Sequence, residues 1–359
     1  MSILIFLIIL VVLVVVHELG HFIAAKKNGV LVEEFGFGLP PRLFGIKIGE
    51  TLYSLNLLPI GGFVKLYGEE YSELKEKKPS EKNKNRAFSF KKPWQKALIV
   101  VAGITGNFIL GWVLISFLFT QGIPMPEKTV VEKVQSNTPA EKAGLKPKDA
   151  IIKVVKDNKT YIINSSPNTD MGTIANRFAG ENITMIVKRD NKEINLSITP
   201  RKNPPQGQGP LGITLSTNFK VVKYPWYQAP FHGLNYAVST TKLIITELTR
   251  ISVQFVTFQK PKVDVAGPVG IARYAKEAQK QGMNALIELT ALLSLNLAVI
   301  NILPFPALDG GRLVFILYEW ITKKRVNQKF ERSLNFIGII LLLTLAAIIT
   351  VNDILKIYR

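Results

Sequence analysis

Four long apolar runs dominate this sequence and restrict what it can fold into. They cover approximately residues 2–25, 97–119, 285–318 and 334–351. A helix needs about 20 predominantly apolar residues to cross a bilayer, with a range of about 17–25. Hydrophobic residues make up 47% of the 359 residues. Their concentration in these runs predicts a polytopic α-helical membrane protein with about four transmembrane helices.

The first run is expected to remain in the membrane as a span with its N-terminus outside. A cleavable signal peptide carries positive charge before its apolar core, whereas the first cations here, Lys26 and Lys27, follow the core. Lysine and arginine are also dense in residues 26–96 and 319–333, and such segments usually face the cytoplasm. Both termini and the central residues 121–284 would then be extracytoplasmic.

The net charge of +19 is high enough to raise the possibility of nucleic-acid binding. However, the cations flank the apolar runs, which is the pattern of a membrane protein near anionic lipid. We therefore expect a lipid bilayer as a partner and no nucleic acid. The chain contains no cysteine, which excludes disulfides and thiolate metal sites.

The central residues 121–218 are expected to form a small β-rich module. Six short runs have the composition of strands, namely VVEKV, DAIIKVV, KTYIIN, NITMIVKR, KEINLSIT and LGITLS. TPAEKAGL and MGTIANRFAG have the composition of short helices. The aromatic, amphipathic segment 219–284 follows. It fits either a helix in the membrane interface or a core helix of an extracellular domain.

The motif HELGH, residues 17–21, lies near the end of the first apolar run. On a helix, positions i and i+4 share a face, so His17 and His21 can bind one metal ion while Glu18 acts as general base. HExxH also arises by chance in soluble helices. Ionisable residues inside a membrane span, however, are costly and usually functional. This context favours a catalytic zinc site.

A catalytic zinc ion usually takes three protein ligands, so a third ligand is expected. His232 is the only other histidine and falls in the outside segment, which leaves a carboxylate of the third run, Glu288 or Asp309. Asp309 follows two prolines in NILPFPALDGG, and such irregular backbone occurs at membrane depth where it is buried in protein or lines a cavity. This favours Asp309 as the ligand. The alternative for Asp309 is a helix cap at the membrane edge.

Two asparagines, Asn296 and Asn301, lie in the same run. Their amides can pair with the unsatisfied backbone of an extended peptide. Alternatively, they form hydrogen bonds between helices.

HELGH and NILPFPALDGG, in this order and spacing, resemble the site-2 protease family of intramembrane zinc metalloproteases. The resemblance is strongest to the bacterial regulator-of-sigma-E protease type, here with a single extracytoplasmic PDZ domain. It implies zinc as cofactor, with His17, His21 and Asp309 as ligands and Glu18 as the catalytic residue. It further implies a multi-pass protein of the bacterial cytoplasmic (inner) membrane, with both termini and the PDZ domain extracytoplasmic.

The resemblance extends to residues that bind substrate. Asn296 and Asn301 match asparagines linked to substrate binding. Gly36, Phe37 and Gly38, in EFGFGLPPRLF, match a segment of a membrane re-entrant β-hairpin that presents an edge to the substrate. TPAEKAGL is similar to a signature of bacterial PDZ domains, and GPLGITLS resembles their carboxylate-binding loop, which would bind peptide C-termini.

The expected activity is peptide-bond hydrolysis within the transmembrane segments of single-pass membrane proteins. Anti-sigma factors and remnant signal peptides are the expected substrates, after a first extracytoplasmic cut. A non-catalytic PDZ-containing membrane scaffold is the alternative, and a metal transporter is a third hypothesis.

The apolar runs and the resemblance together divide the chain into eight segments. These are a first span with HExxH (1–25), a cytoplasmic-side segment with the re-entrant hairpin (26–96), a second span (97–120), the PDZ domain (121–218), an amphipathic membrane-associated region (219–284), a third span with the LDG motif (285–318), a cytoplasmic loop (319–333) and a fourth span with the C-terminus (334–359).

Overall fold

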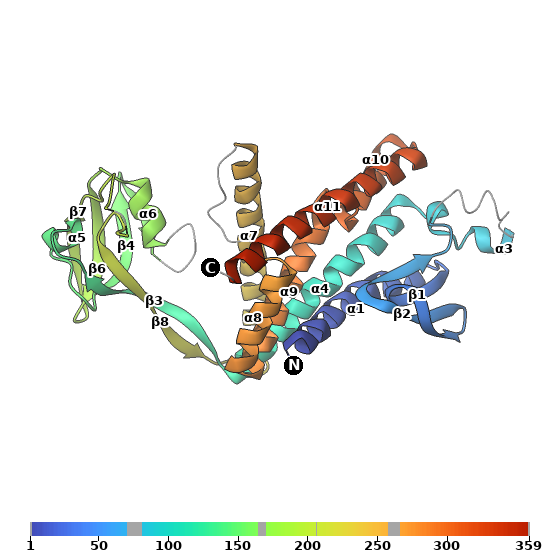
Figure 1. The fold of residues 1–359 in the computed structure, drawn as a ribbon, viewed down its shortest axis with the longest axis horizontal. Helices are drawn as coiled ribbons and strands as arrows, with labels where there is room; N and C mark the ends of the chain where they lie inside the picture. The colour runs from blue at the N-terminus through green and yellow to red at the C-terminus, as the bar shows by residue number, and fades with distance from the viewer. Residues whose placement is uncertain (1, 70–80, 164–169, 206, 258–265, 358–359) are drawn as a thin grey trace. The chain divides into compact units, whose positions relative to one another are not determined.

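The chain forms two compact units in the computed structural model, which describes residues 2–69, 81–163, 170–205, 207–257 and 266–357. The first unit combines Met1–Thr120 with Pro225–Arg359, and the second is Gln121–Tyr224. Both are drawn in Figure 1. The first unit contains the long apolar helices and the second is β-rich.

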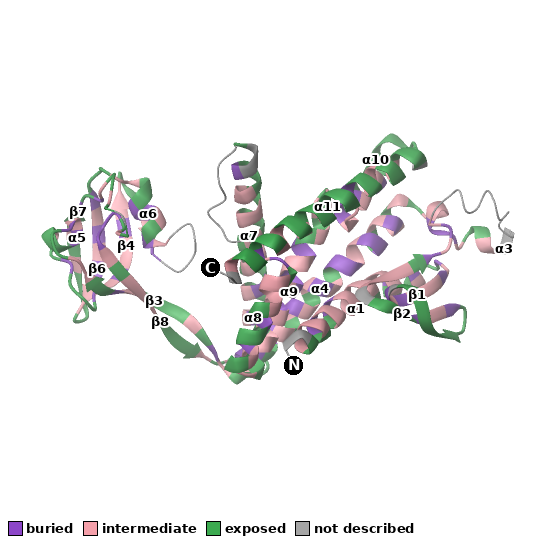
Figure 2. Cartoon of the chain, in the orientation of Figure 1, coloured by how far each residue is buried: buried purple, intermediate pink, exposed green. Residues whose placement is uncertain are grey.

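Among the residues that the structure describes, four helices are long and apolar enough to cross a membrane, as the apolar runs predict. They are α1 (Ser2–Lys27), α4 (Pro93–Gln121), α9 (Met283–Ile302) and α11 (Gln328–Ile357). Large apolar side chains point outward from them, including Leu4 on α1 and Leu343 on α11, which are 60% and 65% exposed. Figure 2 shows how little of α11 is buried. Helices that are apolar on all sides suit a lipid environment.

The third apolar run is divided into two helices, because proline cannot continue a helix. Helix α9 ends at Ile302, and α10 (Asp309–Thr322) begins after the segment that contains Pro304 and Pro306. This break places Asp309 in the first turn of α10.

Helices α1 and α4 pack at close range through glycines. A Cβ atom at Gly20 would overlap the carbonyl oxygen of Ala102, and one at Gly106 would lie 2.9 Å from the carbonyl oxygen of Val16. Small residues at such crossings let two apolar helices approach backbone to backbone. The approach brings α4 against the face of α1 that carries HELGH.

Two long strands, β1 (Val32–Ile48) and β2 (Thr51–Leu66), form an antiparallel hairpin that packs beside α1 (Figure 1). The hairpin is bent onto itself, so that the first half of β1 lies between the two halves of β2. Gly36, for example, pairs with both Ser54 and Phe63. The bend therefore converts two strands into a compact sheet.

Helices α7 (Ala229–Val256) and α8 (Pro268–Gln281) belong to the first unit. The indole of Trp112 on α4 donates a 2.8 Å hydrogen bond from Nε1 to the carbonyl oxygen of Pro230 in α7. Helix α7 therefore packs with the apolar helices of the first unit, and both interpretations of residues 219–284 stay predictions. The first unit is completed by α3 (Glu81–Lys84) and the 3₁₀ helix η1 (Phe88–Phe90).

The described residues of the second unit form a six-stranded sheet with two short helices. The strands are β3 (Ile123–Val134), β4 (Ala150–Lys156), β5 (Lys159–Ile162), β6 (Ile183–Arg189), β7 (Lys192–Ile198) and β8 (Ile213–Val222). In the sheet they lie in the order β7–β6–β4–β3–β8, and β5 pairs with β4. Helices α5 (Pro139–Lys142) and α6 (Met171–Arg177) complete it. The unit extends past the predicted boundary at 218, because β8 continues to Val222.

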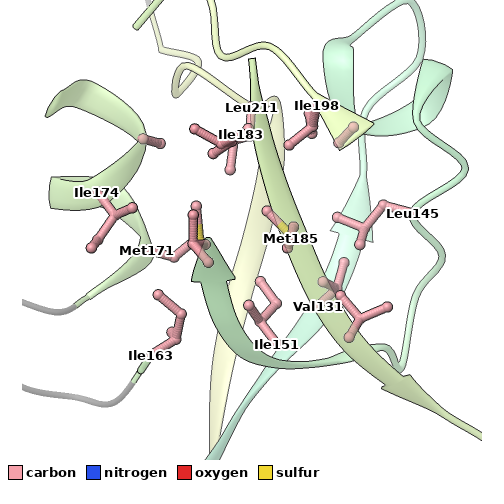
Figure 3. Packing of buried hydrophobic residues seen from close by; sticks show 14 residues of the cluster. Val131, Leu145, Ile151, Ile163, Met171, Ile174, Ile183, Met185, Ile198 and Leu211 are labelled. Atoms are coloured by element: carbon pink, nitrogen blue, oxygen red, sulfur yellow. The ribbon is translucent and has the colours of Figure 1, made fainter. Parts of the chain in front are cut away.

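The core of the second unit lies between the sheet and α6. Figure 3 shows its packing, in which Met171 and Ile174 of α6 meet Ile183 and Met185 of β6. All four side chains are at most 1% exposed. Ile183 and Met185 are alternate residues of one strand and so face the same side of the sheet, whereas Met171 and Ile174 lie three positions apart on one face of α6.

Candidate metal centre

Three side-chain atoms from the two ends of the chain converge at one point in the first unit. Nε2 of His17 and Nε2 of His21 lie 3.0 and 3.2 Å from Oδ2 of Asp309, and 3.2 Å from each other. Ligand atoms held about 2.0–2.1 Å from a tetrahedral zinc ion lie about 3.3 Å from one another. The spacing of the three atoms therefore fits a single zinc ion.

The hydrogen bonding of these residues also fits a metal. Nδ1 of His21 lies 2.9 Å from the carbonyl oxygen of Ile99, and a carbonyl can only accept, so this nitrogen carries the proton. In the neutral ring, Nε2 then presents its lone pair. Oδ2 of Asp309 is buried, and among the described residues its polar neighbours are the two imidazole nitrogens, with neither of which it forms a well-aligned hydrogen bond. Buried polar atoms are normally satisfied, and a metal ion would satisfy this one.

The sequence around Asp309 explains how the carboxylate reaches the two histidines. The two glycines that follow it, Gly310 and Gly311, lie against the turn that joins α9 to α10. A Cβ atom at either position would overlap a backbone oxygen, that of Leu303 for Gly310 and that of Phe305 for Gly311. Only glycine allows the first turn of α10 to pack this tightly on the turn before it.

A cavity of about 280 Å³ opens at the three converging residues. Glu18 lines it together with His17, His21 and Asp309. Strand β2 forms another wall, and its Gly62 lies so close to α1 that a Cβ atom would come 3.0 Å from Cγ of Glu18. The cavity thus holds a carboxylate beside the metal ligands, which is the arrangement that a general base requires.

Only one of the two asparagines predicted to bind substrate lines the cavity. Asn301 lines the cavity. The amide of Asn296 donates a 2.8 Å hydrogen bond to the carbonyl oxygen of Leu292 in its own helix. Of the two, Asn301 is therefore the one in position to meet a bound peptide.

The edge that the resemblance implies near residues 36–38 does not lie at Gly36 or Phe37. Gly36 and Phe37 each pair on both sides, Phe37 with Gly62 and Leu55, because the bent hairpin encloses the first half of β1. The outer strand beside the cavity is the end of β2, of which Gly62, Phe63, Val64 and Leu66 line the cavity. Within the described part of the chain this segment pairs with β1 alone, so no strand covers its other edge. The Leu66 N–H is already used, because it donates a 3.3 Å hydrogen bond to Oε2 of Glu69.

Two residues of the site were not predicted from the sequence. Arg312 lines the cavity, forms a 2.6 Å ion pair with Glu69 and stacks 4.7 Å above the ring of Phe88. Asn107 of α4 lies with Nδ2 at 3.3 Å from Nδ1 of His17. Asn107 could have been predicted from its position in the apolar run GITGNFILG, since polar residues in membrane spans are usually functional.

Comparison with known proteins agrees with this geometry. The family model described as Peptidase family M50 matches residues 5–345. The chain belongs to peptidase family M50. This membership confirms the predicted site-2 protease family, and with it a metalloendopeptidase whose cofactor is zinc.

Several relatives match this M50 peptidase over nearly its whole length. A putative zinc metalloprotease of Clostridium perfringens is 35% identical and covers 96% of this chain and 95% of its own. A putative zinc metalloprotease of Fusobacterium nucleatum is 32% identical, with 100% of both chains covered. The regulator of sigma-W protease RasP of Bacillus subtilis is 30% identical, with 98% of both chains covered.

Proposed function

We propose that this M50 peptidase hydrolyses peptide bonds within the transmembrane segments of single-pass membrane proteins. His17, His21 and Asp309 would hold zinc, and Glu18 would be the catalytic base. The observation that carries the proposal is the convergence of these residues on a cavity whose walls include a helix that is long and apolar enough to cross a membrane.

The bound zinc ion would supply Lewis-acid polarisation of the scissile carbonyl and activation of the attacking water. Glu18 would accept the proton of that water and pass it to the amine nitrogen that leaves.

The strand-free edge of β2 at residues 62–64 is the proposed docking site for the substrate backbone. A transmembrane helix must be unwound locally before its peptide bond can be attacked, and a strand edge satisfies the exposed N–H and C=O groups by β-augmentation. Gly36, Phe37 and Gly38 would contribute by holding β2 from its paired side. Asn301, and by the family resemblance Asn296, would bind the remaining backbone groups.

The second unit is proposed to be the PDZ domain, which would bind peptide C-termini or screen out substrates with bulky extracytoplasmic parts. Its strands and its short helix after Thr138 agree with the quoted PDZ-like motifs. The protein would lie in the bacterial cytoplasmic membrane with its termini and this unit outside. Anti-sigma factors and remnant signal peptides, already cut once outside, are the proposed substrates. The name of RasP, a regulator of sigma-W protease, fits the first class.

The deciding experiment is cleavage of a single-pass substrate by the full-length protein in liposomes. Glu18→Gln should lower the rate by about 10²–10⁴-fold, the usual contribution of a general base, without loss of zinc. Glu288→Gln is the matched control, because Glu288 is a second intramembrane carboxylate that does not line the cavity, and it should cleave like wild type. If Glu18→Gln cleaves at the wild-type rate, the catalytic assignment is wrong. If neither wild type nor control cleaves any substrate while the second unit binds C-termini, the scaffold alternative is favoured.

A further inference from the structure

A buried asparagine meets His17 on the side of the ring that faces away from the metal position. Asn107 of α4 is fully buried, and its Nδ2 lies 3.3 Å from Nδ1 of His17. The other ring nitrogen of His17, Nε2, is the one beside Asp309. Asn107 therefore stands directly behind a proposed zinc ligand.

One face of α4 contacts both histidines of α1. Ile99, Gly103 and Asn107 recur every four residues and so lie on the same side of the helix. The carbonyl oxygen of Ile99 accepts from Nδ1 of His21 at 2.9 Å, and the absence of a side chain at Gly103 leaves room for the His21 ring. His21 thus donates its outer hydrogen bond to the backbone of α4, whereas the corresponding atom of His17 meets a side chain.

The chemistry of zinc ligation determines which atom of the amide must face His17. A neutral imidazole that binds metal through Nε2 carries its proton on Nδ1. That N–H group is a donor, and the Nδ2 group of an asparagine is also only a donor. Two donors cannot form a hydrogen bond, so the amide oxygen has to replace the nitrogen when His17 binds zinc.

A half-turn of the Asn107 carboxamide makes this exchange, because its oxygen and nitrogen occupy nearly equivalent positions. In the present orientation Oδ1 is buried and lacks a hydrogen-bond partner among the described residues. A buried carbonyl group without a partner is unfavourable, so the rotation also gives Oδ1 a donor. The backbone at this position is fixed independently, because the Ser294 hydroxyl of α9 donates a 2.7 Å hydrogen bond to the carbonyl oxygen of Asn107.

We propose that Asn107 is a positioning residue for the metal centre, whose carboxamide oxygen accepts the Nδ1–H of His17 and so directs Nε2 towards zinc. Outer hydrogen bonds of this kind fix the tautomer and orientation of metal-binding histidines. The inference rests on the proposed function, since it takes His17 as a zinc ligand.

The test measures zinc binding by the full-length protein in detergent, through competition with a chelator. Asn107→Leu keeps the approximate size of the side chain and removes the acceptor, and it should weaken zinc binding about 10–100-fold, as losses of outer partners do. Asn107→Asp restores an acceptor oxygen and should bind zinc at least as tightly as wild type. Thr105→Ala is the control, because this side chain lies on an exposed face of the same helix and its hydroxyl donates to the Val101 carbonyl oxygen, and the variant should bind zinc like wild type.

A second measurement does not depend on variant folding. Nuclear magnetic resonance of the zinc-loaded wild-type protein with ¹⁵N-labelled histidine should show the His17 proton on Nδ1. A proton on Nε2, or wild-type zinc affinity in a folded Asn107→Leu variant, would overturn the role of Asn107. If instead Asp309→Ala also keeps wild-type affinity, the proposed zinc site itself is at fault, so the two failures can be told apart.

Discussion

Oδ2 of Asp309 lies 3.0 Å from Nε2 of His17, although one residue is near the start of the chain and the other is near its end. The contact exists because α9 stops at Ile302 and the chain re-enters a helix at Asp309. The carboxylate is thereby held at the first turn of α10, facing α1. The proposed metal centre depends on this one relationship between distant parts of the sequence.

Replacement of Asp309 by alanine should remove zinc from the protein. Loss of a direct ligand should exceed the roughly 10–100-fold effect expected for an outer partner, so the zinc dissociation constant should rise by more than about 100-fold. Metal content after dialysis, measured by mass spectrometry, reports the loss. Glu288→Ala removes the other carboxylate of the same apolar run and should retain zinc. Equal zinc content in the two variants would contradict the ligand assignment.

Gly103→Ala should disturb the metal centre without changing any polar group. The added Cβ atom would overlap Nε2 of His21, so the ring must move or the two helices must separate. Overpacking of this kind costs about 1–3 kcal/mol, and a displaced Nε2 should also lower zinc affinity. Chelator competition and thermal unfolding measure the two effects. Thr105 lies on an exposed face of the same helix, so the control variant Thr105→Ala should change neither the zinc affinity nor the thermal stability. Wild-type zinc affinity and stability in Gly103→Ala would show that the helix crossing tolerates a side chain.

Removal of the Arg189 side chain should destabilise the second unit. The Nε and Nη2 atoms of Arg189 donate to the two carboxylate oxygens of Asp149 at 2.7 and 2.6 Å, and Asp149 is only 1% exposed. Breaking a buried pair on one side costs about 3–5 kcal/mol, and the partial exposure of Arg189 places Arg189→Met at the lower end. Hydrogen exchange of the full-length protein should quicken in β4 and β6.

A matched control for this pair is Lys156→Met in β4. Lys156 faces Asp157 and Glu181, whose side chains are 78% and 54% exposed. Ion pairs with such exposed partners contribute about 0–1 kcal/mol, so exchange should be nearly unchanged. Equal protection in the Arg189 and Lys156 variants would mean that the Asp149 pair does not stabilise the sheet.

The turn of the β1–β2 hairpin should respond to acid at an unusually low pH. Hydrogen bonds from Arg86 and Lys26 lower the pKa of Glu50 from its ordinary value of 4.5 to about 2. Because the folded pKa is depressed, the stabilisation that these contacts provide is present above about pH 4.5 and is lost as the pH falls towards 2. The titration of the Glu50 carboxyl group, followed by nuclear magnetic resonance, should show this midpoint.

Arg86→Leu removes the first of these two partners and should move the Glu50 midpoint back towards 4.5. Arg42→Leu is the control, because Arg42 pairs with Glu34 at 3.0 Å and should leave the Glu50 midpoint in place. A wild-type midpoint near 4.5 would show that Glu50 is not held by these cations in solution.

Local patterns in the sequence predicted the four apolar helices and the strands of the second unit, whereas the β1–β2 hairpin was expected from the family resemblance alone. The length and uniform apolarity of the four runs predict spanning helices wherever they lie in the chain, since each helix satisfies its own backbone. His17 and His21 share a face because a helix repeats every 3.6 residues, and the prolines before Asp309 predict the break that precedes it. The strands of the second unit could also be predicted from short runs of the sequence, because neighbouring residues of a strand face opposite sides of the sheet and therefore differ in polarity.

Only the tertiary structure decided how these elements face one another. The pairing of Gly36 with two strand segments depends on the bend of the hairpin. Because of this bend, the strand edge without a partner strand is at the end of β2 and not at Gly36. The position of Asn107 behind His17 likewise depends on the crossing of α1 and α4. Register and crossing are set by contacts between residues far apart in sequence, which no local periodicity encodes. The sequence determined which side chains were available for a metal centre, and the packing of α1, α4 and α10 decided which atoms of those side chains meet.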